Sequence, residues 1–354
     1  MTQHNSVRWG ILGPGTIARA FAGGLARSRS GRLVAIGARN PGKPEYKIHF
    51  PGARVHDGYD ALLADPDIDA VYIATLHPQH AEWAIRAAEA GKHVLCEKPM
   101  GLTASEAEII FAAARRAGTF MGEAFMYRLH PMTGKILDLI VSGTIGEVRA
   151  IKSSFGFALP AFDPEHRLYA NHLAGGGILD VGCYPVSMAR LIAGAVLGRP
   201  FLDPETVTGI AHLGATGVDE WAAALLKFPG GILAELSCSV SLAQDNMLRV
   251  LGTGGRLEVK DFWFATGHGG GTASIEIVGP DESRKRIEIS EPGWLYSFEA
   301  EAASEAILSG RTQFTPPGMS WDDTLGNMKV LDAWRQAVGL EYGIEKTRRE
   351  GRPA

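Results

Sequence analysis

The 354-residue sequence predicts an α/β protein in which an N-terminal parallel sheet is followed by an α/β domain with an open, mostly antiparallel sheet. Two observations support this prediction. Strand and helix patterns alternate along the first third of the chain. After residue 123, apolar runs follow one another with glycine turns and few helices between them. We therefore assign residues 1–123 and 124–354 to separate domains.

The strands predicted in the first third are continuous apolar runs, as expected for a parallel sheet that is covered on both faces. They lie at residues 7–12, 32–38, 53–55, 70–75, 93–96 and 119–121. The predicted helices run from the turn after residue 12 to about residue 27, and over 59–63, 81–90 and 104–117.

In the second part, strands are predicted at 146–157, 207–212, 220–227, 231–239, 246–252, 255–260 and 273–278. Helices are predicted at 132–142 and from 178 through 191. An open sheet of this size needs one face covered, so we expect a partner subunit.

The composition is that of a soluble globular protein, with 45% hydrophobic and 21% charged residues. The 35 basic and 39 acidic residues give a net charge of −4, which argues against nucleic-acid binding. The three cysteines are far apart and form no CxxC pair, so we expect free thiols in a reducing cytoplasm. The first strand leaves no room for a signal peptide, and no apolar run approaches membrane-spanning length. We therefore expect a cytoplasmic protein without membrane contacts.

A glycine motif, G-x-G-x-x-A, lies between the first strand and the first helix, at Gly13, Gly15 and Ala18. Such a turn exposes the amides of a helix N-terminus to a pyrophosphate. Gly13, Gly15, Thr16 and Ile17 are therefore candidate ligands of a dinucleotide. The alternative is a turn that only packs the helix on the sheet.

The end of the second predicted strand indicates which dinucleotide is bound. An Asp or Glu there usually holds the ribose 2′-hydroxyl of NAD, but residues 37–40 contain no acid. Arg39 is placed to contact a 2′-phosphate, and Lys43 adds positive charge nearby. We therefore predict NADP, with NAD as a possible substitute. A solvated loop arginine is the alternative.

Two neighbouring strand ends present polar side chains at the edge of the sheet where ligands bind. Thr75, His77 and His80 follow the fourth strand, and Glu97 and Lys98 follow the fifth. A metal would need a third ligand that the spacing does not supply, so no metal site is predicted. We expect these side chains to line a nicotinamide pocket, with helix capping as the alternative for the histidines.

Lys98 is a candidate catalytic residue because Pro99 ends the strand directly after it. Partial desolvation and a cationic nicotinamide would both lower the pKa of this lysine toward a range useful for proton transfer. Its charge would also lower the pKa of a neighbouring phenol. The alternative is a surface ion pair with Glu97, which would contribute little.

Asp180 and Tyr184 follow three glycines at residues 175–177 and are four residues apart, so they share a helix face. This arrangement suggests a polar site at a helix start. On spacing alone, a capping aspartate and a packing tyrosine are the better explanation.

Three motifs together resemble the glucose–fructose oxidoreductase/inositol dehydrogenase (Gfo/Idh/MocA) family. They are G-P-G-x-I-A, E-K-P and G-G-G-x-L-D-x-G-x-Y, and the resemblance extends from Val7 to about Leu340. It implies a Rossmann domain that binds NAD(P), and a second domain that binds substrate and whose open sheet mediates oligomerisation, as a homodimer or homotetramer. Further stretches resemble the branch of dimeric dihydrodiol dehydrogenases and NADP-dependent D-xylose dehydrogenases: 38–39, 77–80, 96–99, 217–219 and Tyr184.

The resemblance also implies roles for individual residues. Tyr184 would be the general acid/base on the substrate hydroxyl, with Lys98 lowering its pKa and Asp180 bracing the site. Many members have His where this chain has Tyr184, which points away from inositol as substrate. Other residues would contact the ligands: Arg128 the cofactor, and His130, Phe155 and Phe157 the substrate.

The expected activity is NADP-dependent hydride transfer from the CH–OH group of a sugar, a cyclic polyol or a trans-dihydrodiol. One alternative is an NADPH-dependent reductase of a keto-sugar of the anhydrofructose type. The other is a non-catalytic regulatory protein that senses NADP.

Overall fold

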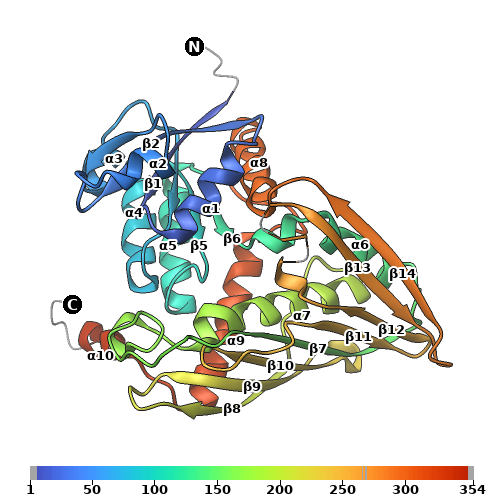
Figure 1. Cartoon of the computed structure of the whole chain (residues 1–354). Helices are drawn as coiled ribbons and strands as arrows, with labels where there is room; N and C mark the ends of the chain where they lie inside the picture. Colours follow the sequence, from blue (N-terminus) through green and yellow to red (C-terminus); the bar gives the residue numbers. More distant parts are fainter. Residues whose placement is uncertain (1–5, 265, 268, 350–354) are drawn as a thin grey trace.

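The computed structural model describes residues 6–264, 266–267 and 269–349. A parallel sheet with helices on both faces forms one part, and a larger, mostly antiparallel sheet forms the other (Figure 1). The fold class predicted from the sequence is therefore confirmed.

The first sheet has six parallel strands in the order β3-β2-β1-β4-β5-β6. Their bounds are β1 Val7–Leu12, β2 Gly31–Ala38, β3 Arg54–Asp57, β4 Ala70–Ile73, β5 His93–Glu97 and β6 Met121–Ala124. The accompanying helices are α1 Thr16–Leu25, α2 Glu45–His49, α3 Tyr59–Leu63, η1 His77–Gln79, α4 His80–Glu89 and α5 Ala104–Ala117. The last strand was expected at 119–121, but β6 begins at Met121 and lies further toward the C-terminus.

A helix from the far end of the chain, α8 Leu295–Leu308, covers the same face of this sheet as α1. The indole nitrogen of Trp9 donates a 2.9 Å hydrogen bond to Oγ of Ser304. A Cβ on Gly24 would lie 2.5 Å from the backbone of Tyr296, so only glycine allows this approach of α1 to α8. Helix α8 is therefore part of the core around the first sheet.

The second sheet has eight strands in the order β14-β13-β12-β11-β7-β10-β9-β8, and only the β7–β10 pair is parallel among those described. The bounds are β7 Val148–Gly156, β8 Thr206–Leu213, β9 Asp219–Lys227, β10 Leu233–Ser239, β11 Leu248–Gly252, β12 Gly255–Val259, β13 Gly271–Val278 and β14 Arg284–Glu291. The edge strand β14 was not predicted, because its charged sequence buries little surface.

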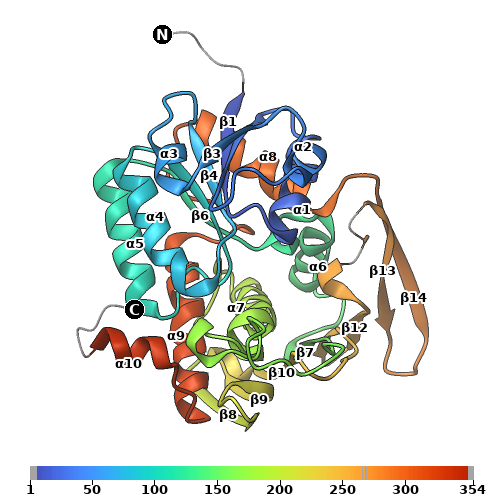
Figure 2. The same ribbon diagram turned by 60° about the vertical axis from the view of Figure 1, so that its left-hand side comes forward.

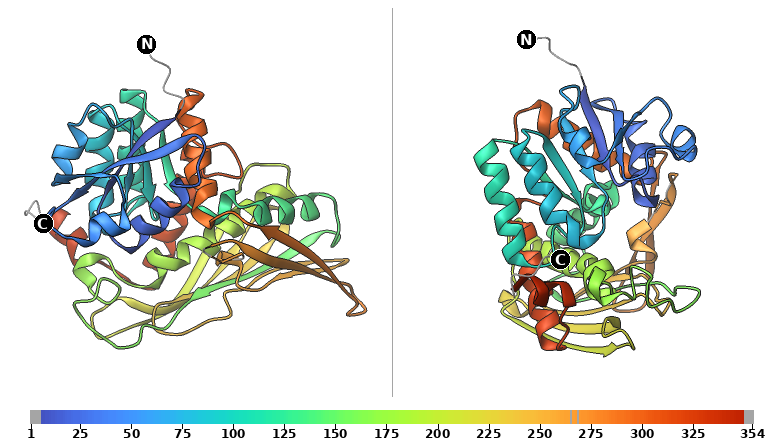
Figure 3. Two further views of the ribbon diagram at one scale, coloured as in Figure 1. Left: turned by 45° about the horizontal axis from the view of Figure 1, so that its top comes forward. Right: turned by 90° about the vertical axis from the view of Figure 1, so that its left-hand side faces the viewer.

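Helices cover one face of this sheet, and α7 lies between it and the first sheet (Figure 2). The remaining elements are α6 Pro131–Val141, α7 Cys183–Val196, α9 Trp321–Ala337, α10 Gly343–Arg349, η2 Met126–Leu129, η3 Asn171–Leu173, η4 Ile178–Gly182, η5 Pro229–Gly231 and η6 Phe262–Phe264. In the described part of the chain, no helix covers the far face of the sheet (Figure 3).

One helical stretch, Asn171–Val196, is long and apolar enough to span a membrane, contrary to the expectation that no run approaches this length. However, 94% of its apolar window is buried inside the protein. This stretch, which comprises η3, η4 and α7, is therefore part of the protein core between the two sheets.

Candidate active site

A cavity of about 620 Å³ lies between the carboxyl edge of the first sheet and the helix-covered face of the second sheet. It brings together most of the side chains predicted from the sequence to form a site. Those that line it are Gly15, Thr16, Ile17, Thr75, His77, His80, Glu97, Lys98, Phe155, Phe157, Asp180 and Tyr184.

The glycine turn opens the start of α1 onto this cavity. Gly13 has φ +84°, and a Cβ there would lie 2.9 Å from the carbonyl oxygen of Ala74, so the turn requires glycine. Gly15 is the N-cap residue, no side chain caps the helix, and its first turn has no acidic residue. A Cβ on Gly15 would meet nothing within 4 Å. The first-turn amides are thus positioned to hold a pyrophosphate.

Arg39 lies at the carboxyl end of β2 and is exposed, close enough to Tyr59 that its charge opposes the burial-driven rise in the pKa of that phenol. Lys43 forms an ion pair with Glu45 at 3.5 Å. Neither residue lines the cavity.

The two histidines after β4 line the cavity, His80 fully buried and His77 partly buried. His80 contacts the carbonyl oxygen of Pro99 through Nδ1 at 2.8 Å and that of Thr75 through Nε2 at 3.1 Å. Burial lowers the pKa of His80 to about 4, and it lowers the pKa of His77 to about 3 against the opposing charge of Asp180. Both rings are therefore neutral at physiological pH. His80 therefore holds the backbone carbonyl of Pro99, directly after Lys98.

Glu97 ends β5 and lies against the interior of the first sheet. Its carboxylate accepts hydrogen bonds from the Tyr72 hydroxyl and from the Lys98 backbone amide. Burial raises the pKa of Glu97, although Lys98 opposes this effect. The sequence alternative of a surface Lys98–Glu97 pair is thus wrong, because both side chains are largely buried.

Lys98 is bound to Asp180 instead. Its Nζ donates a 2.6 Å hydrogen bond to the backbone carbonyl of Asp180 and lies 3.7 Å from Oδ1 of the same residue. Burial disfavours the ammonium, but the nearby negative charge, above all that of Asp180, outweighs this effect, so the pKa of Lys98 is raised. For the protein chain itself, the pKa of Lys98 is therefore raised where a lowered value was expected, because the expectation did not include this carboxylate.

Tyr184 stands on the first turn of α7, where its ring lies 5.2 Å from Nζ of Lys98. Its hydroxyl contacts Sδ of Met126 at 3.5 Å, and the ring packs edge-on against Phe155 and Trp263. Burial raises the pKa of Tyr184 well above its usual value, and the charge of Glu97 adds to this. The expectation of a lowered phenol pKa was therefore wrong for the protein chain itself.

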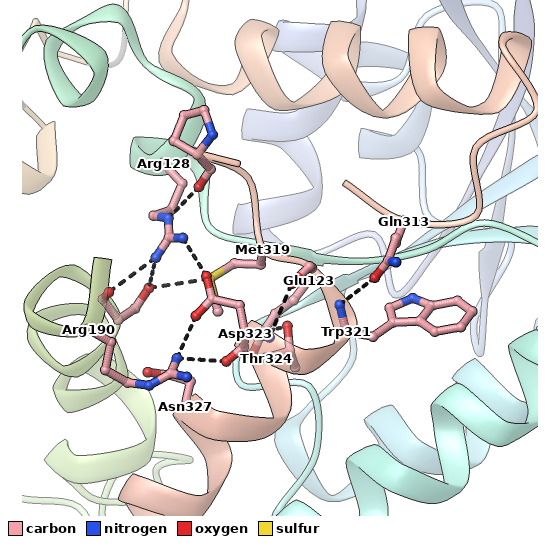
Figure 4. Close-up of polar contacts among 12 residues, drawn as sticks. Glu123, Arg128, Arg190, Gln313, Met319, Trp321, Asp323, Thr324 and Asn327 are labelled. Atoms are coloured by element: carbon pink, nitrogen blue, oxygen red, sulfur yellow. Dashed lines mark hydrogen bonds and ion pairs between the residues drawn. The ribbon is translucent and has the colours of Figure 1, made fainter. Parts of the chain in front are cut away.

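Arg128 does not reach the cavity, and its expected contact with a cofactor is not formed there. It is 1% exposed and forms an ion pair with Asp323, which also pairs with Arg190 of α7 (Figure 4). Its guanidinium also donates to Oγ of Ser187 at 2.9 Å. The role of Arg128 is to tie η2 to α7 and α9.

His130 also lies away from the cavity, where its Nε2 contacts Oγ1 of Thr266 at 3.0 Å and its Nδ1 accepts from the amide of Met132. It caps α6 and packs against Phe298. Phe155 and Phe157, by contrast, do line the cavity.

The cavity also contains residues that the sequence did not indicate, among them Arg167, Asn246, Phe264 and Tyr296. Arg167 donates a 3.0 Å hydrogen bond to Oδ1 of Asp180. These residues come from irregular segments and from a helix start far along the chain. No periodic pattern marks them in the sequence.

A dinucleotide-type turn that opens onto a buried acid–base group is the arrangement of a nicotinamide-dependent oxidoreductase. Residues 7–125 match the family model described as oxidoreductase family, NAD-binding Rossmann fold, and residues 134–258 match the GFO/IDH/MocA C-terminal domain. The chain belongs to the GFO/IDH/MocA oxidoreductase family.

Similar proteins cover nearly the whole chain. The trans-1,2-dihydrobenzene-1,2-diol dehydrogenase of Mus musculus is 32% identical, over 96% of this chain and 99% of its own length. The D-xylose 1-dehydrogenase (NADP(+)) 2 of Haloferax volcanii is 33% identical, over 95% and 99%. The 3-ketoreductase KijD10 of Actinomadura kijaniata, solved with NADP and TDP-benzene, is 29% identical with a TM-score of 0.81, over 94% and 98%.

Proposed function

We propose that this chain transfers a hydride between NADP and the CH–OH group of a sugar, a cyclic polyol or a trans-dihydrodiol. The observation that supports this most directly is the position of Tyr184. Its phenol lies in one cavity with the glycine turn of α1, next to the ammonium of Lys98. The Mus musculus and Haloferax volcanii relatives are named for a dihydrodiol and for D-xylose, and the latter also for NADP.

When bound, NADP supplies the hydride acceptor, and the protein supplies position and proton transfer. Gly13, Gly15, Thr16 and Ile17 hold the pyrophosphate at the start of α1, while Arg39 contacts the 2′-phosphate. Thr75, His77, His80 and Glu97 line the nicotinamide side of the cavity.

Tyr184 takes the proton of the substrate hydroxyl during oxidation and returns it during reduction. The ammonium of Lys98 lies over the ring and stabilises the phenolate form of Tyr184, which is the base in oxidation and is left behind when the phenol donates its proton in reduction. Asp180 holds Lys98 charged and in place. Phe155 and Phe157 supply apolar walls for the substrate.

Reduction of a keto-sugar is the second candidate function. The Actinomadura kijaniata relative is a 3-ketoreductase, and the same acid–base group serves either direction. A silent NADP sensor is disfavoured because Lys98, Asp180 and Tyr184 all face the cavity.

The test is nicotinamide reduction with NADP⁺ or NAD⁺ and a panel of aldoses, cyclitols and trans-dihydrodiols, together with NADPH oxidation by keto-sugars. We expect turnover of at least one class with NADP⁺. No turnover in either direction, with NADP(H) binding intact by calorimetry, would favour the sensor.

We further propose a cytoplasmic homodimer or homotetramer that assembles through the open face of the second sheet. Ile210, Leu225 and Leu233 on that face are 74%, 59% and 52% exposed. Ile210 and Leu225 line a depression of about 530 Å³ formed by β7 to β11. Sedimentation should give a dimer or tetramer that Leu225→Glu dissociates, and a monomeric wild-type protein would contradict this.

A further inference from the structure

Asp219, the first residue of β9, contacts the start of η4. It is 0% exposed and does not line the cavity. Its Oδ2 accepts a 2.6 Å hydrogen bond from the amide of Ile178, the first residue of η4. Asp180 and Tyr184 follow this anchored residue along the chain. Asp219 therefore contacts the backbone that leads to both side chains, and not the cavity itself.

Two glycines allow this contact. Gly176 has φ +104°, and a Cβ there would lie 2.1 Å from Oδ1 of Asp219. A Cβ on Gly177 would lie 3.4 Å from Oδ2 of the same carboxyl and 3.3 Å from Sγ of Cys238. The glycine run before Asp180 thus makes room for the carboxyl of Asp219 to reach the first amide of the helix.

Helix η4 is a π-helix, and the carbonyl of Asp180 within it accepts from side chains. Nζ of Lys98 lies 2.6 Å from this oxygen, and Sγ of Cys183 lies 3.7 Å from it. In an α-helix, a carbonyl accepts from the amide four residues on, which here belongs to Tyr184. A π-helix uses the amide five residues on instead. The winding of η4 therefore decides what the carbonyl of Asp180 can accept.

We infer that Asp219 is a positioning residue for Lys98. By holding the amide of Ile178, its carboxyl keeps η4 wound as a π-helix and leaves the carbonyl of Asp180 to the ammonium. Without this anchor, the segment can continue the winding of α7, so that the amide of Tyr184 replaces Lys98 at that carbonyl. Lys98 then loses its 2.6 Å hydrogen bond and its position over the ring of Tyr184. The consequence for catalysis rests on the proposed function, whereas the hold on Lys98 does not.

Two substitutions separate the hydrogen bond from the charge. Asp219→Leu removes the acceptor, whereas Asp219→Asn removes only the charge and keeps an oxygen for the amide of Ile178. Ser239→Ala is the matched control for stability. Ser239 is also 0% exposed, and its Oγ bonds the backbone of Glu220 and Leu242, which lie outside η4. We expect all three variants to have a lower melting temperature.

The hold on Lys98 is measured by its rate of acetylation with acetic anhydride at mildly alkaline pH, relative to that of the exposed Lys47, by peptide mass spectrometry. This rate rises when the ammonium loses its hydrogen bond, because a lower pKa leaves more free amine. Asp219→Leu should raise the rate at least about tenfold, which corresponds to about one pKa unit. It should also lower kcat at least about tenfold, with NADP⁺ affinity unchanged. Asp219→Asn and Ser239→Ala should stay within about threefold of the wild-type protein in both measurements.

Three results would overturn the inference. Acetylation of Lys98 might be unchanged in Asp219→Leu, Asp219→Asn might be as impaired as Asp219→Leu, or Ser239→Ala might raise acetylation just as much. The last result would assign the effect to lost stability alone. Acetylation needs no turnover, so it tests the inference with or without a known substrate. Failure of the wild-type protein to oxidise any alcohol would instead refute the proposed function.

Discussion

The ammonium of Lys98 is held by Asp180, through a 2.6 Å hydrogen bond to its backbone carbonyl and a 3.7 Å approach to Oδ1. This contact joins the end of β5 to η4, and so connects the two sheets at the cavity. Burial alone would lower the pKa of Lys98, so the carboxylate is what keeps the ammonium charged.

Asp180→Asn should lower the pKa of Lys98, because burial then acts without its main opposing charge. The asparagine keeps the backbone carbonyl and the side-chain volume. The pH profile of kcat should lose activity on its alkaline side at a lower pH than in the wild-type protein. A profile of unchanged shape would mean that Asp180 does not control the charge of Lys98.

Arg39→Ala should weaken binding of NADP⁺ by about tenfold or more and leave binding of NAD⁺ nearly unchanged, because only NADP⁺ carries the 2′-phosphate. Lys43→Ala is the matched control, since Lys43 already pairs with Glu45. Its effect should be smaller. Fluorescence titration with NADP⁺ and with NAD⁺ measures the affinities. If Arg39→Ala weakened binding of both dinucleotides equally, Arg39 would not contact the 2′-phosphate.

Asp323 neutralises two buried arginines, Arg128 and Arg190, which are 1% and 0% exposed. Asp323→Asn should lower the free energy of unfolding by about 3–5 kcal/mol, because it leaves buried charge unpaired. Asp203→Asn removes the other partner of Arg190, a 58% exposed carboxylate, and should cost at most about 1 kcal/mol. Urea unfolding measures the free energy of unfolding of both variants. Similar losses would mean that Asp323 contributes no more to stability than the exposed Asp203.

Glu123 accepts hydrogen bonds from the Met100 amide and from Oγ1 of Thr324, each at 2.8 Å. Burial nevertheless raises its pKa from 4.5 to about 7. The folded protein therefore keeps a proton there that the unfolded chain has lost. The stability from this proton is full below the unfolded pKa and disappears as pH rises through the folded value.

Glu123→Gln should remove this part of the pH dependence, worth about 3 kcal/mol between about pH 5 and about pH 8. Urea unfolding at both pH values measures it. Other buried acids such as Asp219 also titrate in this range. The free energy of unfolding of Glu123→Gln is therefore compared with that of the wild-type protein at each pH. Parallel curves would show that Glu123 stays ionised.

The first sheet was largely predictable because its strands are apolar throughout and its helices have clear limits. The predicted helices 59–63 and 104–117 coincide with α3 and α5. Ligands bind beyond the carboxyl ends of parallel strands, and this rule correctly predicted that His77, His80 and Lys98 line one cavity. Strand β14 was not predicted because it is a charged edge strand. Helix α8 was not predicted because it packs on a part of the chain that is distant in sequence, and such tertiary contacts leave no local pattern.

The electrostatics of the site could not be predicted. The sign of the Lys98 pKa shift depends on Asp180, and the contact between them forms only in the folded chain. The family resemblance implied that Arg128 contacts the cofactor. In the fold it forms an ion pair with Asp323, which lies on α9, 195 residues further along the chain. Arg167 has no periodic or motif signal at all. Each of these depends on which side chains the fold brings together.

The central claim is that Tyr184 moves the proton during hydride transfer. The most direct measurement is kcat for alcohol oxidation against pH in the wild-type protein and in Tyr184→Phe, with NADP⁺ affinity as a control. Because burial raises the pKa of Tyr184, the wild-type rate should climb with pH across the accessible alkaline range. The phenylalanine variant should be at least about 100-fold slower and show no such rise, with unchanged NADP⁺ binding. A variant with wild-type kcat and the same rise would contradict the account.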